Sequence, residues 1–163
     1  MAPPHPLYLA WLAEPVADGE RRPRAPLHLT LVPPFAGDEG AVLAAARAAT
    51  AGRAPVAVAA TGTARFGPRR DVPVVLVAPD DGLRDLHEAL MDALAGAGVD
   101  LGHARHVRAG FTPHVSLPRR DAGPPPIAPG EPLVVDHVAL LRRGDGTVVA
   151  GRAPLARRGT PRR

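Results

Sequence analysis

Two short segments of this chain, Leu27-His28-Leu29-Thr30-Leu31 and Pro113-His114-Val115-Ser116-Leu117, share one pattern. Each alternates apolar residues with one histidine and one hydroxyl residue. Because successive side chains of a β-strand point to opposite faces, each histidine is predicted to share a strand face with its hydroxyl partner. Each strand then packs its apolar face inward and presents an imidazole and a hydroxyl about 7 Å apart on the other face.

This His-x-Ser/Thr pattern occurs more often than the composition predicts. With 7 histidines and 8 serines plus threonines in 163 residues, about 0.3 such triplets are expected by chance. Two occur, 86 residues apart, and Ser116 is the only serine of the chain. The pair therefore indicates a shared function for His28 and His114 rather than two unrelated surface histidines.

Between these two segments, capping residues and the spacing of apolar residues predict two helices. Asp38 can N-cap a helix through residues 42–50 that Gly52 ends, and Asp80 or Asp81 can cap a second one. Gly96 and Gly98 close this second helix. Its inward face is formed by Leu83, Leu86, Leu90 and Leu94, at spacings of three and four.

The apolar runs between the helices and turns predict strands, and Pro33-Pro34 and Pro118 are expected to end the two motif strands. Gly144-Asp145-Gly146 indicates a hairpin turn. The predicted strands span residues 7–12, 27–32, 56–63, 72–78, 114–117, 133–141 and 148–155. The predicted loops span residues 14–26, 65–71, 98–112 and 123–132.

Each half of the chain thus contains a strand, a helix and a motif-bearing strand. The motif strand precedes the helix in the first half and follows it in the second. We therefore expect an α+β domain with two similar lobes. A single domain is predicted over residues 1–156, followed by an arginine-rich tail at residues 157–163.

The composition excludes several kinds of chemistry. The chain has no cysteine and no lysine, so it has no disulfide, thiol nucleophile, lysyl Schiff base or P-loop lysine. No apolar run approaches the roughly 20 residues of a membrane span, and the first residues do not resemble a signal peptide. We expect a cytoplasmic monomer. The net charge of +4 is compatible with an anionic substrate.

Two histidines suit phosphodiester cleavage, because in-line displacement needs one group to take a proton and another to give one. Imidazoles, with an ordinary pKa near about 6.5, can do both at neutral pH. The hydroxyls of Thr30 and Ser116 can donate to the non-bridging phosphate oxygens. No metal ion and no cofactor are required for this chemistry.

The two motifs resemble the paired signature of the two-histidine (2H) phosphoesterases. The segments 28–31 and 111–119 are most similar to the LigT-like branch, the 2′-5′ RNA ligase family, and segment 62–67 is similar to its central stretch. The resemblance implies a bilobal fold, its lobes being antiparallel sheets with helices outside, and a pseudo-twofold central cleft. It also implies 2′,3′-cyclic phosphodiesterase chemistry on RNA ends or related nucleotides, with His114 as the base and His28 as the acid. Arg119 corresponds to the arginine that commonly follows the second motif, although Pro118 precedes it here.

Several other residues bear on this interpretation. Arg65 and Arg105 are further candidates for contacts with the substrate, and Phe35 or Phe111 could stack on a base. The pair His103 and His106 lacks further ligands, so a metal site there is disfavoured. His87 is expected on a helix surface, and His5 and His137 are expected to be structural.

Three functional hypotheses remain open from the sequence. The first is a 2′,3′-cyclic phosphodiesterase acting on RNA ends or small cyclic nucleotides. The second is a module of the same fold that binds RNA ends or nucleotides without turnover. The third is an enzyme that acts on a small cyclic phosphate related to ADP-ribose.

Overall fold

The computed structural model describes residues 6–101, 106–117 and 126–156. Within these ranges the strands form one sheet in the order β2-β9-β8-β1-β3-β6-β5-β4-β7, and every pairing is antiparallel. The strands are β1 (Leu7–Leu12), β2 (Arg21–Arg22), β3 (His28–Phe35), β4 (Val56–Phe66), β5 (Val72–Val77), β6 (His114–Ser116), β7 (Pro132–Val135), β8 (His137–Gly144) and β9 (Gly146–Pro154).

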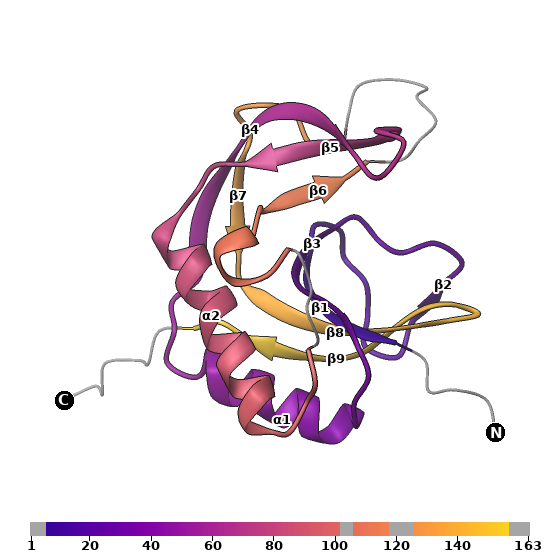
Figure 1. Ribbon diagram of the computed structural model, residues 1–163, viewed down its shortest axis with the longest axis vertical. Coiled ribbons are helices and arrows are strands. Elements are labelled where there is room, and N and C mark those ends of the chain that lie inside the picture. Colours follow the sequence, from indigo (N-terminus) through magenta and orange to yellow (C-terminus); the bar gives the residue numbers. More distant parts are fainter. Residues whose placement is uncertain (1–5, 102–105, 118–125, 157–163) are drawn as a thin grey trace.

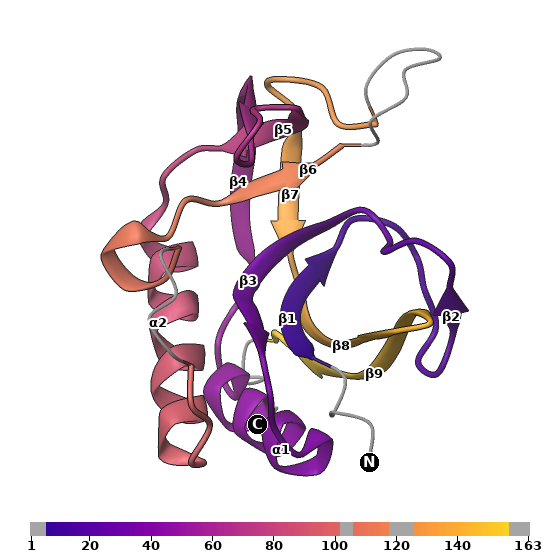
Figure 2. The ribbon, with the colours of Figure 1, turned by 45° about the vertical axis from the view of Figure 1, so that its right-hand side comes forward.

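The sheet is divided into two lobes that meet where β3 pairs with β6 (Figures 1 and 2). The first lobe contains β2, β9, β8, β1 and β3, and the second contains β6, β5, β4 and β7. The sheet strands of the chain leave the first lobe after β3 and return to it with β8, so the first and last strands, β1 and β9, both belong to the first lobe. This arrangement confirms the predicted α+β fold with two lobes.

The helices α1 (Glu39–Thr50) and α2 (Asp81–Gly96) begin at the predicted caps. The Asp38 carboxylate accepts from the backbone N–H of Ala41, and Asp80 accepts from that of Leu83, both at 2.9 Å. The two helices pack against each other (Figure 1). α1 also contacts β8 and β9, and α2 contacts β3 and β4. The four leucines predicted for the inner face of α2 are all buried.

β1 is apolar along its whole length because both of its faces are buried. Leu7, Leu9 and Trp11 belong to the main core, whereas Tyr8 and its neighbours Ala10 and Leu12 belong to a second, smaller apolar cluster. This second cluster forms because the first lobe curls, as Figure 2 shows. It lies on the same side of the sheet as His28, which pairs with Leu12 across β1 and β3.

The prediction that Pro33-Pro34 ends the first motif strand is wrong, because β3 continues to Phe35. Its register with β1 shifts between the pairs Leu9–Val32 and Leu7–Phe35, and this irregularity accommodates the prolines. The pairing of β3 with β6 is at Leu29. The prolines lie beyond this pairing. The N–H that each proline lacks therefore breaks no hydrogen bond between β3 and β6.

Three other predicted boundaries are also corrected. The strand expected over residues 133–141 is divided at Asp136 into β7, which pairs with β4, and β8, which pairs with β1. β4 extends to Phe66, so Arg65 lies in a strand rather than a loop. The expected loop 14–26 contains the short strand β2. The turn at residues 144–146 is confirmed, with Gly146 at a φ of +84°.

No helix in the described ranges is long and apolar enough to cross a membrane. The predicted tail, residues 157–163, lies outside those ranges.

Candidate active site

The two motif strands are neighbours in the sheet. β3 and β6 pair antiparallel through Leu29 and Val115, both of which are fully buried. Extending this register by one residue each way places His28 opposite Ser116 and Thr30 opposite His114. The four polar side chains therefore share the face opposite to Leu29 and Val115. Directly opposed residues have Cβ atoms about 5 Å apart, and diagonal ones, as the two histidines are, about 7–8 Å.

Both imidazoles are held by the same local contact. Nδ1 of His28 lies 2.7 Å from the carbonyl oxygen of Pro26, and Nδ1 of His114 lies 2.7 Å from that of Thr112. In each case the partner is the carbonyl two residues earlier. Because a carbonyl only accepts, Nδ1 carries the proton, and Nε2 is the nitrogen available for proton transfer.

Burial lowers the pKa of both histidines below the ordinary imidazole value. For His28 the positive charges of Arg143 and His114 lower the pKa further, against the raising effect of the Pro26 carbonyl. For His114 the charge of His106 adds to burial, against the Thr112 carbonyl. The electrostatic coupling between His28 and His114 follows from their closeness.

Aromatic rings flank the two imidazoles, one in each lobe. The Tyr8 ring centroid is 5.4 Å from that of His28, and the Phe66 centroid is 4.7 Å from that of His114 in an edge-to-face arrangement. The Arg143 guanidinium lies 4.9 Å above the centroid of Tyr8. This cation on an aromatic ring has no equivalent beside Phe66 among the described residues.

A cavity of about 890 Å³ adjoins His28 and Ser116. Its walls include Leu117 from the second motif and Arg24 from the loop before β3. Sites that enclose whole small-molecule ligands have volumes of about 300–1,000 Å³. The cavity therefore has room for a ligand of nucleotide size, with a guanidinium at one wall.

The structure brings together four of the predicted site residues, His28, Thr30, His114 and Ser116, and separates other predicted residues from them. Arg65 is exposed and lies on the opposite face of β4 from Phe66, whose ring contacts His114, so Arg65 does not share that face. Phe35 and Phe111 are 6% and 8% exposed and both belong to the core, which disfavours stacking of a base on an open ring face, but Phe111 also lines a pocket. Arg105 and Arg119 lie outside the described residues.

The expectation that His87 is a helix-surface residue is wrong, because its side chain is fully buried. Its Nδ1 donates to the Leu31 carbonyl on β3 at 2.6 Å, and its Nε2 accepts from the Arg108 backbone N–H at 2.8 Å. The ring stacks parallel on Phe111, with centroids 4.1 Å apart. His87 thus connects α2 to both motif segments, and burial lowers its pKa.

The residues that sequence reasoning missed are Tyr8, Phe66 and Arg143. Tyr8 and Phe66 are two of the few aromatics, and Arg143 belongs to an evident basic pair, but no local pattern relates them to the histidines. Arg142, which precedes Arg143 in the chain, forms an ion pair with Glu39. Arg143 has no carboxylate partner within the described ranges. In that same part of the chain, no three histidine or acidic side chains gather as a metal site.

Comparisons with known proteins show the family and the fold of the chain. The family described as the 2′-5′ RNA ligase superfamily matches residues 10–147. No curated protein matches the chain in sequence. Escherichia coli LigT complexed with 3′-AMP is similar in structure, with a TM-score of 0.62 and 20% identity over 95% of this chain and 100% of that one. TT0787 of Thermus thermophilus has a TM-score of 0.62 and 23% identity, over 92% and 97% of the two chains. A crystal structure of a phosphoesterase has a TM-score of 0.60 and 20% identity, over 95% and 100%. At these identities the similar structures establish the fold alone.

Proposed function

The chain belongs to the 2′-5′ RNA ligase superfamily of 2H phosphoesterases, and on this premise we propose that it hydrolyses 2′,3′-cyclic phosphates of RNA ends or related nucleotides. Family membership makes it a phosphoryl-transfer enzyme. The narrower reaction is supported by one observation above all. Two imidazoles, each with Nε2 available, lie diagonally across adjacent strands with one hydroxyl beside each.

The proposed reaction assigns one proton transfer to each imidazole. Neutral His114 takes a proton from water through Nε2 while the water oxygen forms a bond to phosphorus. Protonated His28 gives a proton to the ribose oxygen as its bond to phosphorus breaks. The product is a phosphomonoester with one free ribose hydroxyl. The direction of this assignment, with His114 as base, follows the family resemblance.

Thr30 and Ser116 are proposed to hold the phosphate during this step. Each lies directly across the strand pair from a histidine, so their hydroxyls flank a phosphate bound between the imidazoles. Donors to the non-bridging oxygens stabilise the charge that develops there. By the resemblance, Arg119 is proposed as a further phosphate ligand, and Arg105 is proposed as a substrate contact because it belongs to a basic cluster.

The mechanism proposed here does not use a metal ion, because the histidine pair supplies both the base and the acid. A substrate of nucleotide type is supported by the size of the cavity beside His28. It is also supported by the fold shared with LigT, which has been crystallised with 3′-AMP and with phosphate. The monomeric state and the cytoplasmic location remain predictions.

The decisive experiment offers the protein the four nucleoside 2′,3′-cyclic monophosphates and a short RNA with a 2′,3′-cyclic end, in excess EDTA. We expect conversion to phosphomonoesters, which phosphorus NMR measures. The double variant His28→Ala/His114→Ala should not carry out this conversion. Binding of these ligands without turnover would favour the alternative of a binding module. Activity lost in EDTA and restored by a divalent ion would contradict the metal-independent mechanism.

A further inference from the structure

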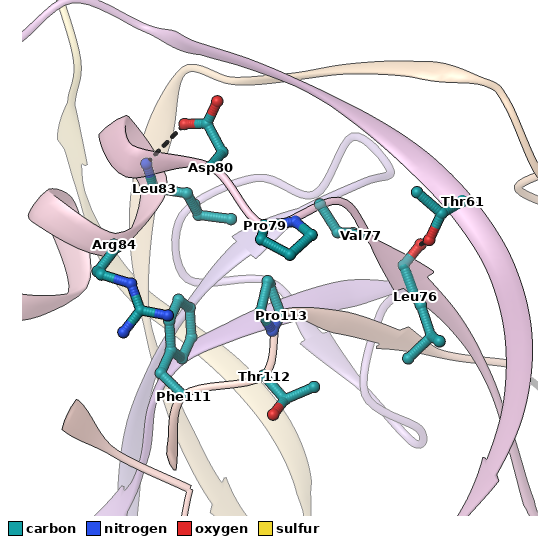
Figure 3. Close-up of a pocket in the computed structure, with 10 residues that line it drawn as sticks. All are labelled: Thr61, Leu76, Val77, Pro79, Asp80, Leu83, Arg84, Phe111, Thr112 and Pro113. Carbon is teal, nitrogen blue, oxygen red and sulfur yellow. Dashed lines mark hydrogen bonds between the residues drawn. The ribbon is translucent and has the colours of Figure 1, made fainter. Parts of the chain in front are cut away.

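A second cavity lies in the other lobe, at the opposite end of β6 from Ser116. It has a volume of about 250 Å³ and is enclosed by β4, β5, the start of α2 and the segment before β6 (Figure 3). We call it the Phe111 pocket. The residues that line it include Thr61, Leu76, Arg84, Phe111, Thr112 and Pro113.

The Phe111 pocket adjoins His114 in two ways. Leu76 is the direct cross-strand partner of His114, so the two side chains emerge on the same face of the sheet. The carbonyl of Thr112, another lining residue, accepts the hydrogen bond from Nδ1 of His114. A group bound in the pocket would therefore lie next to the imidazole that faces the phosphate.

The size and lining of the pocket suit one flat ring system. Its wall is mainly apolar and includes the Phe111 ring and two prolines, Pro79 and Pro113, as Figure 3 shows. A cavity of about 150 Å³ holds benzene, whereas whole drug-sized ligands need about 300 Å³ or more. At 250 Å³ the Phe111 pocket lies between these values.

The ring of Phe111 is fixed before any ligand binds. One of its faces stacks on His87, which is itself held by Leu31 and Arg108. The ring is 8% exposed and belongs to the main core, and the small part of its surface that remains open lines the pocket. The ring therefore forms a fixed apolar wall that a bound ring can contact, and a preorganised wall reduces the entropy that binding would otherwise lose.

The pocket also has a polar edge. The Arg84 guanidinium extends beside the Phe111 ring in Figure 3 and has no carboxylate partner within the described ranges. On the opposite wall the Thr61 hydroxyl donates to the Leu76 carbonyl at 3.3 Å and can still accept a hydrogen bond, and the Asp80 carboxylate also lines the pocket. An apolar slot with hydrogen-bonding groups at its edge suits a nitrogen heterocycle better than a hydrocarbon ring.

We propose that the Phe111 pocket is the subsite that holds the nucleobase of the substrate, so that base recognition takes place in the second lobe beside His114. This inference rests on the proposed function and specifies its substrate as a nucleoside derivative rather than any cyclic phosphate. Because base–aromatic stacking tolerates every base, the pocket predicts cleavage of all four nucleoside cyclic phosphates.

The test compares Thr61→Trp, which fills the pocket from β4, with Thr63→Trp, an exposed position on the same strand outside the pocket. Substrates are nucleoside 2′,3′-cyclic monophosphates and the cyclic phosphate of 1-O-methylribose, which lacks a base. We expect Thr61→Trp to raise KM for the nucleoside substrates about tenfold or more, with kcat nearly unchanged. The base-lacking substrate should react equally with both variants and the wild type, but with a higher KM than the nucleosides.

Binding of nucleoside 2′-monophosphates, measured by calorimetry, separates this inference from the function on which it rests. If the wild type turns over cyclic phosphates but Thr61→Trp and Thr63→Trp bind nucleotides alike, the base subsite is wrong and the function stands. If Thr61→Trp weakens nucleotide binding while no cyclic phosphate is cleaved, the subsite stands and the proposed reaction is wrong. A Thr61→Trp effect of equal size on the base-lacking substrate would also overturn the subsite.

Discussion

His28 and His114 are held by the same backbone contact but have different neighbours. His28 lies beside Tyr8, which carries the Arg143 guanidinium on its ring, whereas His114 lies against Phe66. The charge of Arg143 acts on the pKa of His28 and is not among the influences on His114. This charge disfavours the protonated form of His28, which is the form that an acid requires, so the assignment of His28 as the acid rests on the family resemblance and not on these neighbours.

The separate roles of the histidines can be tested with leaving groups. A diester with an activated phenolate leaving group needs little protonation, so it should restore activity to the variant that lacks the acid far more than to the one that lacks the base. We expect strong rescue of His28→Ala and weak rescue of His114→Ala when kcat/KM is compared with that for a cyclic nucleotide. Equal rescue would contradict separate roles, and rescue of His114→Ala alone would reverse them.

Arg143 should influence the pH dependence of activity through His28. A nearby positive charge disfavours imidazolium, so Arg143→Gln removes a cause of the lowered pKa and raises that pKa. If His28 is the acid, it stays protonated to higher pH, and the alkaline limb of the kcat/KM profile moves upward. The matched control is Arg142→Gln, because Arg142 pairs with Glu39 instead. A shift of the acidic limb would identify His28 as the base.

The hydroxyls of Thr30 and Ser116 should contribute less than the histidines. Thr30→Ala and Ser116→Ala each remove one donor to the phosphate, and loss of such a donor lowers kcat on the order of a hundredfold. Thr30→Ser keeps the hydroxyl and should retain most of the activity. Full activity in both alanine variants would show that these hydroxyls do not hold the phosphate.

At the scale of elements, α2 determines how the two motif strands are supported. His87 reaches from this helix to the Leu31 carbonyl of β3 and to the Arg108 N–H in the short 3₁₀ helix at Arg108–Gly110. One buried side chain thereby satisfies a backbone acceptor from one motif strand and a donor from the segment that leads to the other. The helical spacing also indicates this burial, because His87 lies four residues after Leu83 and three before Leu90, on the apolar face of α2.

His87→Ala should therefore destabilise the fold strongly. It leaves a buried carbonyl and a partly buried N–H without partners and opens a cavity beside Phe111, for a combined loss of about 3 kcal/mol or more in the free energy of unfolding. Urea denaturation measures this change. Asp85→Ala, at an exposed position on the same helix, is the control and should change stability little. A loss no larger than that of the control would contradict the role of His87.

At the scale of the whole molecule, the active site is assembled at the junction of the lobes. β3 comes from the lobe that contains the first and last strands, β1 and β9, and β6 comes from the other. The main core continues beneath this junction, because residues of β1, β3, β5, α2 and β8 belong to one apolar cluster. The relative position of the two histidines therefore depends on the packing of the entire domain.

Stability should fall on mild acidification. Burial lowers the pKa of His28, His87 and His114 in the folded protein, so below about pH 6.5 the unfolded chain binds more protons than the folded one. The free energy of unfolding, measured in urea, should thus decrease from about pH 7.5 to pH 5.5. His87→Gln should show a shallower decrease than the wild type. A rise in stability over this range would contradict the sign of these pKa shifts.

Much of the fold was predictable from short segments. The helix caps Asp38 and Asp80, the leucine face of α2 and the hairpin turn at residues 144–146 follow from local backbone preferences that operate within a few residues. The alternation that places His28 with Thr30 and His114 with Ser116 is likewise a property of any extended strand. For these features the amino-acid sequence by itself was sufficient.

The tertiary structure decided which of these segments meet and in what register. The Leu29–Val115 pairing, the division of residues 133–141 between two lobes, and the passage of β3 through two prolines depend on partners far away in the chain. The same is true of Tyr8 and Arg143 beside His28, and of the hydrogen-bond partners of His87, Leu31 and Arg108. Local periodicity determines which face a side chain occupies, but long-range packing determines what lies opposite that face.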